Sequence, residues 1–184
     1  MSKKLILIIG APGAGKSTQA NLLAQKYPEK ITSYSTGELL KEESQSGSAT
    51  GKIISDYFYK GHLVPSTILI DVVLDAIKAA PTDVVVIEGF PRKEKQVTLF
   101  GDVLFSHHEI ELLNVIEISI NDTLAKERFT GSDEIFENEM QAFKETIAKV
   151  EQYYAAHDLL KVVDGEAPLD ETFNQIESTI QEKL

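Results

Sequence analysis

A glycine-rich segment near the start of the chain has the residue types and spacing that bind phosphate. Residues 10–17 read Gly-Ala-Pro-Gly-Ala-Gly-Lys-Ser and fit the pattern G-x-x-x-x-G-K-[ST]. Glycines let the backbone N–H groups of such a loop point at phosphate oxygens, and the dipole of the following helix adds positive potential. We expect Lys16 to neutralise the outer phosphates of a nucleotide and the Ser17 hydroxyl to bind Mg²⁺.

A second segment, residues 84–92, combines a carboxylate with an arginine. It reads VVVIEGFPR, so an apolar run ends at Glu88 and a Gly-Phe-Pro turn presents Arg92. Ligands of parallel α/β sheets bind at the carboxyl ends of strands, which places both residues near the glycine-rich loop. Glu88 can hold Mg²⁺ through water, and Arg92 can clamp a phosphate. Without the loop, an ordinary solvated turn would be the better interpretation.

Apolar runs alternate with amphipathic segments along the chain. The runs at residues 5–9, 84–87, 112–120 and 159–163 are rich in β-branched residues, as are strands buried on both faces of a parallel sheet. Helical patterns occupy residues 16–27, 65–80, 121–129, 134–156 and 170–184. The alternation predicts an α/β fold of the three-layer P-loop NTPase type, with about five strands in a central parallel sheet.

Residues 35–62 interrupt this alternation. They have helical spacing without a strand, and Gly47, Gly51 and Gly61 punctuate them. Ser35 and Glu38 have the spacing of a capping box. We interpret this segment as a small helical insertion on the sheet.

Composition narrows the class of protein. A length of 184 residues predicts one domain over residues 1–184, and 42% apolar with 26% charged residues is typical of a globular protein. The net charge of −11 argues against nucleic acid as the main partner. The first apolar run is too short for a targeting segment, and no run approaches the ~20 residues that span a bilayer. We expect a cytoplasmic protein without a membrane partner.

The two motifs, with STGELLK (35–41) and GHLVP (61–65) between them, resemble the adenylate kinases, which are ATP:AMP phosphotransferases of the nucleoside monophosphate kinase family. The resemblance is strong over residues 5–100, weakens over 124–131 and returns over 162–173. It implies a parallel-sheet core, a helical monophosphate-binding insertion at about 35–64 and a short lid at about 129–137. It also implies a monomeric enzyme that uses Mg²⁺ to transfer the γ-phosphate of ATP to AMP.

The resemblance assigns roles to individual residues. The ATP-binding set is Gly13, Ala14, Gly15, Lys16, Ser17, Thr18, Arg128 and Ala167. The AMP-binding set is Thr36, Lys41, His62, Leu63, Val64, Gly89, Arg92 and Gln96. Lys16, Lys41, Arg92 and Arg128 would hold the charges during transfer, while Ser17 and Glu88 would place Mg²⁺. Thr36, together with Lys93, favours AMP over pyrimidine acceptors.

Several of these residues have a purely structural interpretation as well. Leu63 and Val64 can belong to the core, Gln96 can be an exposed helix residue, and Arg128 can lie along its own helix. The stripe of Phe136, Met140 and Phe143 is predicted to be core packing.

The chain departs from the family pattern in its arginines. Only Arg92 and Arg128 are present, and Lys41 stands at the arginine of the family's STG motif. Glu88 stands at the usual aspartate of the family's D-G-F-P-R motif. Residues 131–143, where the family has further arginines, contain four carboxylates and no basic residue. These acids either stabilise the N-terminus of the long helix through its dipole, or they weaken the binding of the triphosphate by the lid. A transition-state arginine is worth ~10³–10⁵ in rate, so fast turnover needs a substitute such as Lys144 or Lys149.

Two alternative functions therefore stay open. The Gly-Lys-Ser-Thr ending is also common in kinases of small metabolites, so the acceptor can be another monophosphate or a small metabolite. The missing arginines allow a catalytically weak nucleotide-binding or regulatory protein.

Overall fold

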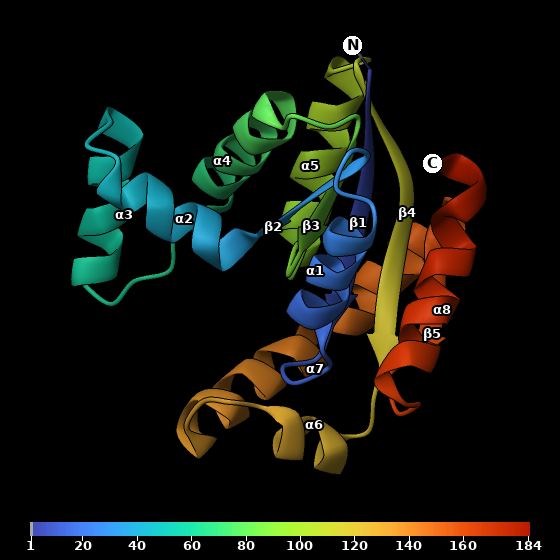
Figure 1. Cartoon of the computed structure of the whole chain (residues 1–184). Coiled ribbons are helices and arrows are strands. Elements are labelled where there is room, and N and C mark those ends of the chain that lie inside the picture. The colour runs from blue at the N-terminus through green and yellow to red at the C-terminus, as the bar shows by residue number, and fades with distance from the viewer. Residues whose placement is uncertain (1) are drawn as a thin grey trace.

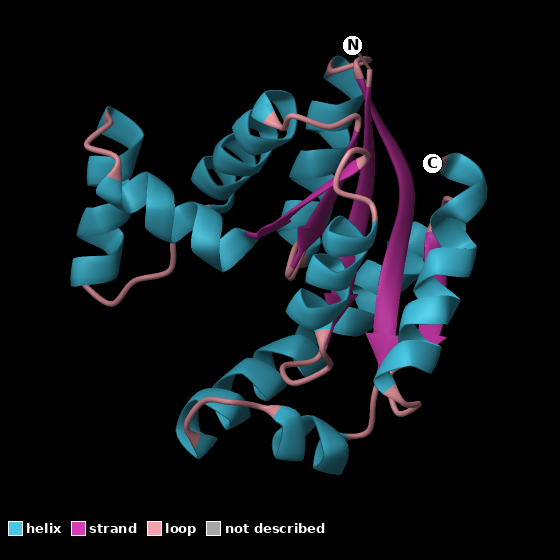
Figure 2. Ribbon diagram, in the orientation of Figure 1, coloured by secondary structure: helices cyan, strands magenta, loops and turns pink. Residues whose placement is uncertain are grey.

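A five-stranded parallel sheet forms the centre of the computed structural model, which describes residues 2–184 (Figures 1 and 2). The strands are β1 (Lys3–Gly10), β2 (Ile31–Ser35), β3 (Val84–Glu88), β4 (Ile110–Ser119) and β5 (Leu160–Asp164). Their order across the sheet is β2-β3-β1-β4-β5, and every strand pair is parallel. Because β1 lies between β3 and β4, the strand order reverses there and opens a crevice at the carboxyl end of β1.

Helices cover both faces of this sheet (Figure 2). They are α1 (Lys16–Lys26), α2 (Thr36–Gln45), α3 (Ala49–Tyr59), α4 (Ser66–Ala79), α5 (Glu94–Ser106), α6 (Asp122–Arg128), α7 (Asp133–Ala156) and α8 (Leu169–Ile180), followed by a 3₁₀ turn at Gln181–Lys183. Leu5, Leu7 and Ile9 of β1 pack in one core cluster with α4, α5 and α7. Ile6 and Ile8 pack in another with α1 and α8. The predicted three-layer α/β fold is thereby confirmed.

The sequence pattern missed one strand, β2. Its residues, Ile-Thr-Ser-Tyr-Ser, are mostly polar, and only Ile31 is fully buried. The strand pairs with β3 on one side and forms the edge of the sheet, so it needs fewer apolar side chains than the central strands do. The expected continuous helix over 170–184 was also wrong at its end, since α8 stops at Ile180.

The segment after β2 forms two helices that project away from the sheet (Figure 1). Ser35 is the residue that precedes α2, but its side chain makes no capping hydrogen bond, so the expected capping box is not formed. Ser48 does cap α3, because its hydroxyl oxygen accepts a hydrogen bond from the Gly51 N–H at 2.8 Å. Between residues 2 and 184, no helix combines the length and apolar character needed to cross a membrane.

Glu117 is a buried carboxyl group on β4, only 6% exposed. Its Oε2 atom has no hydrogen-bond partner among the described residues. Burial, and next the neighbouring Glu151 carboxylate, raise the pKa of Glu117 from 4.5 to about 7. A carboxyl group whose pKa is higher in the folded state binds an extra proton on folding, so this site loses stability as the pH rises from 4.5 towards 7.

Substituting Glu117→Gln is therefore expected to stabilise the fold at pH 8 and to change it little at pH 5. We expect a Tm increase of about 5 °C at pH 8, measured by thermal unfolding. Glu111→Gln, an exposed change on the same strand, is the matched control. An equal change in Tm at the two pH values would rule out titration of Glu117 as the cause.

Candidate nucleotide-binding and phosphoryl-transfer site

The glycine-rich loop joins the end of β1 to the start of α1 at the reversal of the strand order. Gly15 precedes the helix with φ 91°, and Gly13 has φ 80°. A Cβ atom placed on Gly13 would lie 2.0 Å from the backbone oxygen of Ala125 in α6. Glycine is needed at this position both for the left-handed backbone and for the close contact with α6.

Substituting Gly13→Ala is expected to displace the loop and to lower the affinity for ATP by roughly tenfold or more, because the phosphate-binding N–H groups lose their arrangement. Calorimetric titration with ATP measures the effect. Gly37→Ala is the control, since its added Cβ would meet only the Ser35 hydroxyl, at 3.8 Å. If the Gly13 variant binds ATP like the wild type, the loop conformation described above is not the binding conformation.

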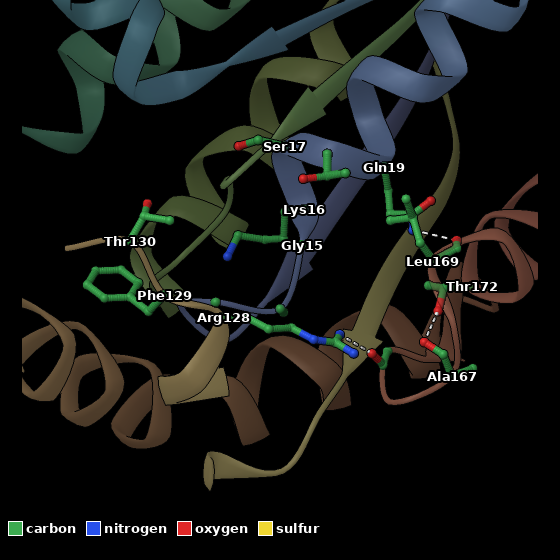
Figure 3. Close-up of a pocket in the computed structure, with 14 residues that line it drawn as sticks. Gly15, Lys16, Ser17, Gln19, Arg128, Phe129, Thr130, Ala167, Leu169 and Thr172 are labelled. Atoms are coloured by element: carbon green, nitrogen blue, oxygen red, sulfur yellow. Dashed lines mark hydrogen bonds between the residues drawn. The ribbon is translucent and has the colours of Figure 1, made fainter. Parts of the chain in front are cut away.

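A cavity of about 540 Å³ lies along this loop (Figure 3). All eight residues expected to bind ATP line it: Gly13, Ala14, Gly15, Lys16, Ser17, Thr18, Arg128 and Ala167. Gly165 lines it too, as do Phe129 and Thr130 of the segment expected to form the lid. Sequence reasoning missed Gln19, Leu169 and Thr172, which also line it. Each of these three lies within five residues of a residue that the sequence did indicate, and this proximity was the signal that could have found them.

Arg128 spans the floor of this cavity (Figure 3). Its Nη1 atom donates a hydrogen bond of 2.6 Å to the backbone oxygen of Gly165. The Gly165 N–H in turn donates to the Ser119 oxygen at the end of β4, at 2.7 Å. The guanidinium thus joins α6 to the turn before α8, and it does not lie along its own helix.

Lys16 lies at the centre of a small cluster of charges. Its Nζ atom donates to the backbone oxygens of Gly10 at 3.0 Å and Ala11 at 2.9 Å. Burial, and next the positive charge of Arg92, lower the pKa of Lys16 to about 8, while Glu88 and Glu139 act in the opposite direction. Two carboxylates and one guanidinium are therefore close enough to Lys16 to influence its charge.

Ser17 and Glu88 meet at the carboxyl ends of β1 and β3. The Ser17 hydroxyl donates a hydrogen bond of 2.7 Å to Oε1 of Glu88. In the parallel register of β1 and β3, Ile8 lies opposite Glu88. This register places the Glu88 carboxylate beside the end of β1, where the glycine-rich loop begins. A hydroxyl and a carboxylate are oxygen ligands of the kind that Mg²⁺ prefers, so this donor set fits the expected metal.

A second cavity, of about 600 Å³, lies on the other side of Lys16. Its walls are the glycine-rich loop, the turn after β3 and one face of α7, with Arg92 and Glu139 among the lining residues. Lys16 lines both cavities and therefore lies between them.

Arg92 is held on three sides beside this second cavity. Its Nε atom donates to the Gly89 oxygen at 2.7 Å, and its backbone N–H donates to Oε1 of Gln96 at 2.7 Å. The Thr146 hydroxyl of α7 donates to the Arg92 oxygen at 2.8 Å. Gln96 is only 6% exposed, so the alternative of an exposed helix residue was wrong.

The other residues expected to bind AMP lie farther apart. Thr36 is buried beside Gly89, with its hydroxyl 3.3 Å from the Gly89 oxygen. Leu63 lines the second cavity but is 78% exposed, so a core position was wrong for it. Lys41 and His62 are exposed, and Val64 is partly buried. Gly89 lines the second cavity, whereas Lys41, His62 and Val64 line neither cavity.

The segment expected to form the lid, residues 129–137, joins α6 to α7 and includes the start of α7. The Ser132 hydroxyl oxygen accepts a hydrogen bond from the Ile135 N–H at 3.2 Å and caps this helix. Asp133 and Glu134 follow in the first turn, where their charge complements the helix dipole. Phe136 and Met140 are buried in a small core cluster, and Phe143 packs against it, so the predicted core stripe is confirmed.

The two lysines considered as substitutes for the missing arginines pair elsewhere. Lys144 forms an ion pair with Asp122 of α6. Lys149 forms one with Glu94 of α5, at 2.9 Å. Both side chains brace α7 against its neighbours, and neither lines the two cavities around Lys16.

The fold and this site define a P-loop kinase. A family model described as adenylate kinase matches residues 8–159. The adenylate kinase of Sulfurovum sp. (strain NBC37-1) is 39% identical, with 99% of this chain and 100% of that protein covered. That of Nautilia profundicola is 40% identical over 98% of each chain, and that of Campylobacter jejuni (strain RM1221) is 41% identical over 91% of each. The chain belongs to the adenylate kinase family, and it is a phosphotransferase.

Proposed function

We propose that the protein transfers the γ-phosphoryl group of Mg²⁺-bound ATP to AMP, giving two molecules of ADP. The observation that carries this proposal is the position of Lys16 between two cavities. One cavity contains the complete residue set expected for ATP, and the other contains Arg92. The similarity to named adenylate kinases over nearly the whole chain supports AMP as the acceptor.

The chemistry needs positioning more than reactive side chains. An oxygen of the AMP phosphate attacks the γ-phosphorus of ATP, and the bond to the β–γ bridging oxygen breaks with its electron pair leaving on ADP. Lys16 lies where charge moves from donor to acceptor, and Arg92 holds the acceptor phosphate. Arg128 lies against the donor nucleotide at the far side of the first cavity.

Ser17 and Glu88 would hold Mg²⁺, directly or through water. When bound, the ion neutralises charge on the phosphates. Ser17 lies in the first turn of α1 beside the phosphate loop and Glu88 ends β3, so the two oxygen ligands lie on separate elements joined by their own hydrogen bond. Removal of Mg²⁺ with a chelator is expected to abolish turnover.

Two segments would move during the reaction. We assign residues 35–64 to acceptor binding and residues 129–137 to a short lid. Lys41 and His62 are exposed and line neither cavity, so their expected roles require α2 and α3 to approach Arg92. We further propose that the protein acts as a cytoplasmic monomer on nucleotides, without nucleic-acid or membrane partners.

A panel of acceptors tests this function. ADP formation from ATP is measured with AMP, CMP, UMP, GMP and dAMP in turn, beside calorimetric binding of ATP and AMP. Turnover that is fastest with AMP supports the proposal. Turnover only with another acceptor would move the protein to a different substrate class. Tight binding of both nucleotides without turnover would favour the regulatory alternative, which the acidic residues of the lid segment suggest.

A further inference from the structure

The second cavity contains a carboxylate where an incoming phosphate needs positive charge. Glu139 of α7 lines this cavity together with Lys16 and Arg92. Its charge reaches Lys16, because Glu139 is one of the two carboxylates that raise the pKa of that lysine. An anion at this place opposes the attraction that Lys16 and Arg92 exert on a phosphate.

A second carboxylate of the same cavity is placed differently. Glu145 also lines the wall, but its Oε1 atom accepts a hydrogen bond from Nε2 of Gln141 at 3.1 Å. It is not among the groups that shift the pKa of Lys16. Of the two α7 carboxylates that line this wall, Glu139 is the one whose charge raises the pKa of Lys16.

The position of Glu139 is fixed by its helix. Met140, next to it, is buried against the loop side of the protein, and Thr146 is hydrogen-bonded to Arg92. The ion pairs of Lys144 and Lys149 hold the same helix to α6 and α5. Glu139 itself is exposed on this helix, so its side chain can turn from the cavity towards solvent.

We propose that Glu139 competes with the acceptor phosphate for Lys16 and Arg92, and so lowers the affinity of the acceptor site. The carboxylate acts as an internal anion in the empty enzyme and is displaced or repelled when the monophosphate binds. This role rests on the proposed function, in which the second cavity is the acceptor side.

The test compares Glu139→Gln with Glu111→Gln, which removes the same charge from an exposed position on β4. Glu111 lines neither cavity and belongs to neither of the two segments proposed to move. Titration calorimetry with AMP needs no turnover, and we expect Glu139→Gln to lower the Kd for AMP by about threefold to tenfold relative to the control. Glu139→Lys should lower it further. The advantage of both variants should shrink at 0.5 M KCl if the effect is electrostatic.

An AMP affinity of Glu139→Gln equal to or weaker than that of Glu111→Gln overturns the inference. So does a tighter affinity that does not depend on salt. Steady-state kinetics separates this failure from failure of the proposed function. If the wild type makes ADP from ATP and AMP but the Glu139 variants bind AMP no better, only the inference about Glu139 fails. If no protein makes ADP while Glu139→Gln still binds AMP more tightly, only the assignment of the reaction fails.

Discussion

Substituting Arg92→Ala is expected to lower kcat/KM for AMP by about 10³-fold. The guanidinium lines the second cavity and is oriented by Gly89, Gln96 and Thr146. Its removal takes away the one arginine of this cavity and leaves Lys16 without its partner for the acceptor phosphate. In the proposed arrangement ATP binds in the first cavity, so its Kd should stay within about twofold of the wild-type value.

Two further variants sharpen this prediction. Arg92→Lys keeps the charge but loses the planar fork, and it should recover only part of the lost activity. Lys95→Ala, an exposed cation on α5, should leave kcat/KM unchanged. Coupled assays with AMP as the varied substrate measure all three. An Arg92→Ala enzyme with near-normal kcat/KM would show that the acceptor phosphate binds elsewhere.

Substituting Lys16→Met is expected to lower kcat by about 10³-fold. In the proposed reaction, the positive charge of this side chain stabilises the negative charge on the phosphoryl group as it passes between the two nucleotides. The variant should fold normally, since the Nζ atom bonds only to the loop oxygens of Gly10 and Ala11. Lys30→Met, an exposed lysine before β2, is the matched control. A Lys16→Met enzyme that turns over at the control rate would contradict the central role of this lysine.

The same lysine predicts a pH dependence of binding. The pKa of Lys16 is lowered to about 8 in the empty protein, so the side chain loses its charge as the pH rises through 8. Phosphates favour the charged form, and ATP binding near pH 8 should therefore take up protons. Calorimetry in buffers of different ionisation enthalpy should detect this uptake in the wild type and find it reduced in Lys16→Met.

The central parts of the fold and the donor site could be predicted from sequence because their signals are local. The glycine-rich loop needs particular residues at fixed spacing, and all eight expected ATP-binding residues line one cavity. The buried strands are marked by continuous apolar runs. Edge strand β2 carries no such run, because a half-exposed strand with one neighbour is stable with Thr and Ser side chains.

The acceptor side was harder to predict, because its residues come from elements that are distant in sequence. Thr146 lies 54 residues from Arg92, yet its hydroxyl holds the Arg92 backbone. Glu139 could be noticed as an acid on a helix, but its proximity to Lys16 depends on how α7 docks against the loop. The partners of Lys144 and Lys149 likewise follow from tertiary packing, which no local pattern encodes.

The most direct test of the proposed reaction starts from ADP alone. The purified protein is incubated with Mg²⁺ and ADP, and the products are followed by ³¹P NMR. Transfer between two nucleotides predicts equal amounts of ATP and AMP, without inorganic phosphate, and the loss of both products in Lys16→Met. Release of inorganic phosphate without formation of ATP and AMP would contradict the assignment. So would the absence of any conversion of ADP by a protein that binds both ATP and AMP.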